Sequence, residues 1–130
     1  MKLIKLVYCI HRNPSLTRDQ FHAYWLDKHA QLVKQYAEFL GAFRYVQSHA
    51  INSRAADAMR KQRGIESKSY DGITEFWFRV DKQAAKNASP IDQDKIDHIQ
   101  QRLIDDERNF IDFSSSSLFI TEEHEIYRLD

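Results

Sequence analysis

The sequence predicts an α+β fold, in which an antiparallel sheet carries two helices on one face. The hydrophobic pattern switches along the chain between the two-residue repeat of strands and the 3.6-residue repeat of helices. The segments follow the order strand, helix, strand, strand, helix, strand. This is the split βαβ, or ferredoxin-like, arrangement. All 130 residues are expected to form one domain, 1–130.

The first strand and the first helix have distinct sequence signals. Residues 3–10 form an apolar run that is interrupted by a lysine, which favours a strand over a signal peptide. Residues 17–41 then predict one long amphipathic helix. Thr17 and Gln20 form a capping box at its start, and Gly41 stands where a left-handed C-cap is expected. His29 falls inside the apolar stripe of this helix.

The other elements follow from alternation and from breaking residues. We expect strands over 41–52, 73–80 and 113–120. Residues 54–63 are rich in alanine and charge, which indicates a short helix or a mobile, mostly solvated excursion. A second long helix is expected to open at Ser89 and Pro90, in the order of an N-cap and a first-turn proline.

Composition narrows the possible partners and the compartment. The 19 basic and 19 acidic residues cancel, which argues against bulk attraction to nucleic acid or to an anionic membrane. The one cysteine cannot form an intrachain disulfide, and no segment is long enough to span a bilayer. A cytoplasmic protein is therefore expected.

The predicted sheet is apolar on both faces, although helices would cover only one. Large side chains alternate in the third strand, with Phe76 and Phe78 on one face and Trp77 on the other. An apolar second face should be buried against another surface. We therefore expect a homodimer of twofold symmetry, with the two sheets packed face to face.

Several motifs, taken in order, resemble the EthD family. They are His11-Arg12, Leu16-Thr17 with Phe21, Tyr24-Trp25, Lys28-His29-Ala30, Gly41 with Tyr45-Val46-Gln47 and His49, Tyr70-Asp71-Gly72-Ile73 with Glu75-Phe76-Trp77-Phe78, Asp105-Asp106-Glu107 with Phe110 and Asp112, and Thr121-Glu122-Glu123-His124. The resemblance runs nearly end to end and implies a dimeric α+β barrel. It also implies a small-molecule role. Relatives include dehydratases and decarboxylases of aromatic polyketides, cofactor-free oxygenases, an isomerase, haem-degrading enzymes and stress-related proteins. The fold does not choose among these activities.

His29 is the main catalytic candidate. A polar ring on an apolar stripe is either a core histidine bonded to a carbonyl or carboxylate, or the acid/base of a small pocket. Trp25 and Val33, one turn away on either side, would wall that pocket and contact substrate.

A second group of candidates shares one face of the second strand. Tyr45 and Gln47 would fix a ligand through hydrogen bonds, and His49 would serve as a second catalytic acid/base. The alternative is a solvent-wetted edge of the sheet.

Glu75 and Trp77 are the remaining substrate-site candidates. Glu75 would orient an imidazole, or else pair with Arg44 or Arg79. No set of ligands has metal-site spacing and no glycine-rich phosphate loop is present, so neither a metal nor a cofactor is expected.

These observations favour a small, cofactor-independent enzyme that acts on an apolar, aromatic or polyketide-like molecule. The reaction would be dehydration, decarboxylation or isomerisation, which needs only an acid/base and hydrogen-bond donors. The alternatives are a cofactor-free monooxygenase or other oxidoreductase, or a non-catalytic, ligand-binding or stress-related dimer.

Overall fold

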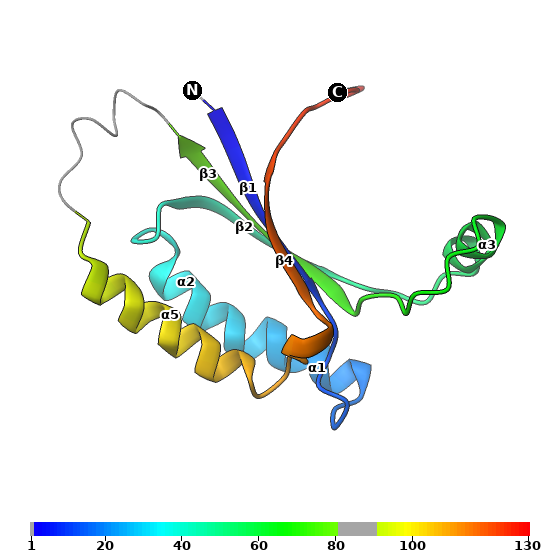
Figure 1. The fold of residues 1–130 in the computed structure, drawn as a ribbon, viewed down its shortest axis with the longest axis horizontal. Helices are drawn as coiled ribbons and strands as arrows, with labels where there is room; N and C mark the ends of the chain where they lie inside the picture. Colours follow the sequence, from blue (N-terminus) through cyan, green and yellow to red (C-terminus); the bar gives the residue numbers. More distant parts are fainter. Residues whose placement is uncertain (1, 81–90) are drawn as a thin grey trace.

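The computed structural model describes residues 2–80 and 91–130 (Figure 1). Its strands are β1 (Lys2–Ile10), β2 (Ala42–His49), β3 (Gly72–Val80) and β4 (Ser117–Glu122). Its helical segments are α1 (Arg18–Tyr24), η1 (Trp25–His29), α2 (Ala30–Ala37), α3 (Arg54–Gln62), α5 (Gln93–Glu107) and the short turn η2 (Phe113–Ser115).

The sheet has the predicted ferredoxin-like topology. Its strand order is β2-β3-β1-β4, and every neighbouring pair is antiparallel. In the centre, Tyr8 of β1 lies opposite Thr74 of β3 and Leu118 of β4. The long helices lie together under one face of the sheet (Figure 1). The predicted α+β class is therefore confirmed.

The first long helix is continuous from α1 through η1 to α2. Thr17 accepts from the Gln20 backbone, and the Gln20 side chain accepts from the Thr17 backbone, so the predicted capping box is present. The helix ends earlier than expected, at Ala37, and one more turn leads to Gly41, whose φ of 87° is left-handed. The five residues of η1 form a π-helical turn, which the sequence pattern did not predict.

The last strand starts later than predicted. Residues expected to begin it, Phe113–Ser115, instead form the turn η2. The Asp112 side chain accepts from the backbone and hydroxyl of Ser114 and from the hydroxyl of Ser115. Such local side-chain bonds compete with strand pairing, so the serine run turns the chain before β4 begins.

Of the other two helices, α3 lies where a short helix was one of the two predicted alternatives, and α5 begins later than predicted. Ser53 caps α3, which has no buried residue and stands away from the rest of the fold (Figure 1). The expected start of the second long helix, Ser89 and Pro90, lies outside the described residues. Within them, α5 begins at Gln93 with Asp92 as its cap.

The core lies between the helices and the sheet, in two clusters. One consists of Ile10, Phe21, Trp25, Phe110 and Ile111, and the other of Val33, Ile99 and Leu103. In the described parts of the chain, no helix has both the length and the apolar character needed to cross a membrane.

Candidate functional site

The π turn η1 aligns the buried face of the first helix. Phe21, Trp25, His29 and Val33 are all buried and recur every four residues. In a regular helix, three such steps would drift by about 120° around the axis. A π turn accommodates one extra residue and so offsets about 100° of that drift. His29 is therefore held on the same line as the core residues, facing the sheet.

A carboxylate of α5 fixes the orientation of the His29 ring. The Nδ1 atom of His29 lies 2.7 Å from Oδ2 of Asp106. The other carboxylate oxygen accepts a 2.6 Å hydrogen bond from the Tyr24 hydroxyl, which itself accepts one from Asn109. Since a carboxylate can only accept, Nδ1 of His29 carries the proton. The arrangement is a base paired with an orienting carboxylate.

The charge state of His29 suits a base. Burial lowers the pKa of its imidazole below the ordinary 6.5, and the hydrogen bond and charge of Asp106 partly oppose this shift. The ring is therefore neutral at pH 7. Its Nε2 atom has a free lone pair and no hydrogen-bond partner among the described residues.

His29 lines a small cavity of about 50 Å³ between the helices and the sheet. The predicted residues Trp25, Val33 and Tyr45 line it too. The structure thus brings four of the eight predicted site residues together, counting His29 itself. Tyr8, Ile10, Thr74, Phe76, Leu103, Glu107 and Ile111 complete its wall.

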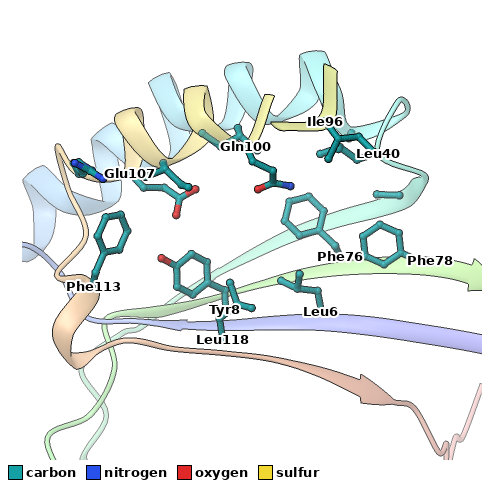
Figure 2. Close-up of a pocket in the computed structure, with 15 residues that line it drawn as sticks. Leu6, Tyr8, Leu40, Phe76, Phe78, Ile96, Gln100, Glu107, Phe113 and Leu118 are labelled. Atoms are coloured by element: carbon teal, nitrogen blue, oxygen red, sulfur yellow. The ribbon is translucent and has the colours of Figure 1, made fainter. Parts of the chain in front are cut away.

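A larger cavity of about 650 Å³ adjoins the small one and shares Tyr8, Phe76, Leu103 and Glu107 with it. Aromatic and aliphatic side chains dominate its wall, and most face one another across the gap between α5 and the sheet (Figure 2). Its polar groups are few: Tyr8, Gln100, Glu107 and Arg108. The size and lining are typical of a pocket for a small organic molecule.

Glu107 has the most perturbed carboxyl group in this region. Burial raises its pKa to about 7; hydrogen bonding with Tyr8 opposes the rise, and the charge of Asp106 adds to it. Burial also raises the pKa of Tyr8, and it raises that of Tyr45 to about 12. Both phenols are therefore neutral hydrogen-bonding groups at pH 7.

His49 and Gln47 lie behind the cavity wall, not in it. The amide nitrogen of Gln47 donates to the Tyr45 hydroxyl (2.7 Å) and to the backbone carbonyl of Trp25 (2.9 Å). Its amide oxygen lies 2.7 Å from Nε2 of His49. The His49 ring stacks on Trp25, with 4.5 Å between centroids. Gln47 therefore positions Tyr45, and His49 packs against the indole of Trp25 without lining the cavity at His29.

Glu75 and Trp77 do not meet His29 at all, which corrects the expectation that they share its pocket. Both lie on the face of the sheet that the helices leave uncovered. Glu75 pairs with Lys5 at 2.8 Å, not with an arginine or an imidazole. Trp77 is covered by the Lys5 and Arg44 cations and donates to Glu123 at 2.7 Å.

Residues 13–114 match the EthD domain. The chain belongs to the EthD family. Solved structures share its fold. An ethyl tert-butyl ether d (EthD) family protein from Bacillus halodurans is 16% identical with a TM-score of 0.56, covering 94% of this chain and 99% of its own. An EthD-like protein from Ralstonia eutropha is 13% identical with a TM-score of 0.55, covering 94% and 92%.

A third similar structure is a dimeric protein of unknown function with a ferredoxin-like fold, from Bacteroides fragilis. It is 6% identical with a TM-score of 0.52, and the match covers 93% of this chain and 96% of that one. No curated protein matches the chain in sequence. At these identities the likeness to solved structures shows the fold alone.

Sequence reasoning missed the groups of this EthD domain that surround His29. Asp106 and Glu107 belong to a motif of the resemblance for which the sequence predicts no role, and Tyr8 lies in the run 3–10, for which it predicts only a strand. The available signal was the adjacency of two acids on the buried side of a helix, a placement that acidic side chains rarely adopt without a partner. In the parts of the chain described, no cluster of three or more His, Cys, Asp or Glu side chains could hold a metal ion.

Proposed function

We propose that this protein is a small enzyme that moves protons on an apolar, aromatic or polyketide-like molecule without a cofactor. One observation carries the proposal: a neutral imidazole, fixed through Nδ1 by Asp106, lines the small cavity, which adjoins the large apolar one. Such a ring can take a proton at Nε2 and return it, which is what dehydration, decarboxylation of β-keto acids and isomerisation require.

The cavity supports the proposed class of ligand. Phe76, Phe78 and Phe113 offer aromatic walls, and two of its four polar groups, Tyr8 and Glu107, also line the small cavity at His29. A flat ring system bearing one or two oxygens would bury its carbon skeleton among the aromatic side chains. Its oxygen would reach the polar end, where His29 could act on the adjacent carbon.

The protein is also proposed to be a homodimer that buries the uncovered face of the sheet. Leu3 and Phe119 remain 40% and 46% exposed on that face. A structural neighbour from Bacteroides fragilis is described as dimeric. Sedimentation equilibrium at micromolar concentration should give twice the chain mass, and Phe119→Glu should give the chain mass. A monomeric wild type contradicts the proposal.

Proton transfer can be tested before the natural substrate is known. The protein is incubated in D2O with α-tetralone, an aromatic ketone, and loss of its α-proton signal is followed by NMR. Wild type should accelerate the exchange, and His29→Gln should lose roughly 100-fold or more of that acceleration. His98→Gln is the matched control, because His98 is exposed on α5. A folded His29→Gln variant that exchanges as fast as wild type refutes the role of His29.

The apolar lining of the large cavity also favours a second candidate, a carrier of small hydrophobic molecules. A carrier should bind α-tetralone without accelerating exchange in either the wild type or the variant. Oxygen uptake during incubation would instead indicate the oxygenase alternative.

A further inference from the structure

Glu107 faces the cavity where the adjacent Asp106 does not. The two residues are neighbours on α5, so their side chains leave the helix about 100° apart. The two carboxylate oxygens of Asp106 are hydrogen-bonded to His29 and Tyr24. Glu107 instead lines both the small cavity at His29 and the larger apolar one, and is the carboxyl group common to the two.

The surroundings of Glu107 favour its neutral acid form. Among the described residues no cation forms a salt bridge with it, and its neighbours across the gap are aromatic and aliphatic. The Tyr8 hydroxyl reaches from the sheet toward its carboxyl group (Figure 2). An ionised carboxylate in an apolar pocket is costly, so the group retains a proton until the pH approaches its pKa of about 7.

We infer that Glu107 is the second proton-transfer group of this site, the acid that donates to the ligand's oxygen while His29 acts on its carbon. The inference rests on the proposed function. It adds a proton donor to the proton acceptor and specifies the ligand further: the oxygen that gains a proton, as a carbonyl does, must lie two bonds from the carbon that loses one.

Every proton and electron pair in the proposed step is accounted for. Nε2 of His29 takes the proton from the carbon next to the carbonyl, and that C–H electron pair forms the new C=C bond. The C=O π pair moves onto oxygen, which takes the proton of Glu107. The products are an enol, an imidazolium held by Asp106 and a Glu107 carboxylate. Reversal of the step restores both groups. When the proton on Nε2 exchanges with D2O before reversal, a deuteron returns to the carbon.

The pH dependence of this step depends on all the ionisable groups around Glu107. Those of its own helix are Asp106 and Arg108, and those on the packed elements are Tyr8 on β1, Tyr45 on β2 and His29 on η1. Both tyrosines stay neutral over the useful range, because burial raises their pKa values. In the profile of exchange rate against pD, His29 is therefore expected to set the acidic limb and Glu107 the alkaline limb.

The first experiment measures α-tetralone exchange as a function of pD in wild type, Glu107→Gln and Glu66→Gln. Glu66 is an exposed glutamate outside the cavities, so its variant is the matched control. Wild type and Glu66→Gln should lose activity below the His29 pKa and again above about 7. Glu107→Gln should be slower by roughly 100-fold and lose the alkaline fall, because the amide cannot ionise. An unchanged rate and profile in Glu107→Gln overturns the inference and leaves the role of His29 intact.

The second experiment does not need turnover. The infrared carbonyl band of bound, 13C-labelled α-tetralone should move to lower wavenumber in wild type at pH 5.5 and move back at pH 8.5. In Glu107→Gln the band should be independent of pH. A pH-dependent band that persists in this variant overturns the inference, because another group would then be the donor. A shifted band in a wild type that shows no exchange overturns the proposed function and supports Glu107 as the donor. Absence of ketone binding contradicts both.

Discussion

The pair formed by His29 and Asp106 can be tested by removing its charge while keeping its shape. Asp106→Asn leaves an oxygen that can still accept the proton on Nδ1 of His29, 2.7 Å away in the wild type. What the variant loses is the negative charge that stabilises the protonated ring. The pKa of His29, already lowered by burial, should therefore fall further.

The size of this fall follows from the nature of the bond. A hydrogen bond to a charged group contributes about 1.5–3 kcal/mol, and one between neutral groups about 0.5–1.5 kcal/mol. The difference, about 1–1.5 kcal/mol, corresponds to roughly one pH unit at about 1.36 kcal/mol per unit. The carboxylate is only partly exposed, with 22% of its side chain accessible, so solvent does not cancel the effect.

The assay is an NMR titration of protein labelled with 15N in its histidines. In wild type the His29 resonance should titrate below 6.5, with the proton of the neutral ring on Nδ1. In Asp106→Asn its midpoint should lie about one unit lower. Asp105→Asn removes the same charge from an exposed neighbour whose one hydrogen-bond partner in residues 2–80 and 91–130 is Gln101, and should leave the midpoint in place.

The lowered pKa of His29 also fixes the direction in which the free energy of unfolding changes with pH. Because the folded-state pKa of His29 lies below the unfolded value, the unfolded chain binds more protons between the two, and stability falls as pH drops through that window. Because Asp106→Asn lowers the folded-state pKa of His29 further, the loss of stability should continue to lower pH in this variant. A His29 midpoint that stays unchanged in Asp106→Asn would refute the reasoning about the pair.

Three further changes test the packing and charge of the site by urea denaturation. Raising the Glu107 pKa from 4.5 to about 7 means that its ionisation costs stability as pH rises through this range. The free energy of unfolding of wild type should therefore fall by roughly 3 kcal/mol more than that of Glu107→Gln between pH 4.5 and 8. Curves of unfolding free energy against pH that run parallel for the two proteins would contradict this. Gly72→Ala should cost about 1–3 kcal/mol and alter the near-ultraviolet spectrum of Trp25, because the new methyl group meets the indole ring; Gly64→Ala, which meets nothing within 4 Å, should leave that spectrum unchanged. Phe110→Ala should lower the free energy of unfolding by about 3–5 kcal/mol, since this ring is fully buried, and a loss below about 1 kcal/mol would show that the core closes over the gap.

The order of the elements could be predicted because each carries a local signal. The capping box at Thr17, the left-handed glycine at position 41 and the alternation of β3 act over a few residues and were found in place. Helical spacing within residues 17–41 likewise predicts that His29 lies on the buried stripe. The π turn brings His29 further into line with the buried residues of that stripe.

The partners of His29 could not be predicted, because the contacts that matter are long-range. Asp106 is separated from it by 77 residues, and no spacing rule links the two. The face of the sheet that carries Glu75 and Trp77 could not be predicted either. Alternation places them on the same face, but large apolar residues occupy both faces of β3, so the pattern does not say which one meets the helices.

The π turn has a consequence for how this helix tolerates changes in length. A turn that holds a surplus residue can lose one and become an ordinary α-helix, with its backbone hydrogen bonds still satisfied. A deletion within Trp25–His29 would thus preserve helicity and also leave α2 with the same face toward the core, because the residue removed is the surplus one. A deletion between Ala30 and Val33, where the helix holds no surplus residue, would instead rotate the residues after it by about 100° and turn Val33 away from the core. Circular dichroism would scarcely distinguish the two deletions, although only the second would disassemble the pocket.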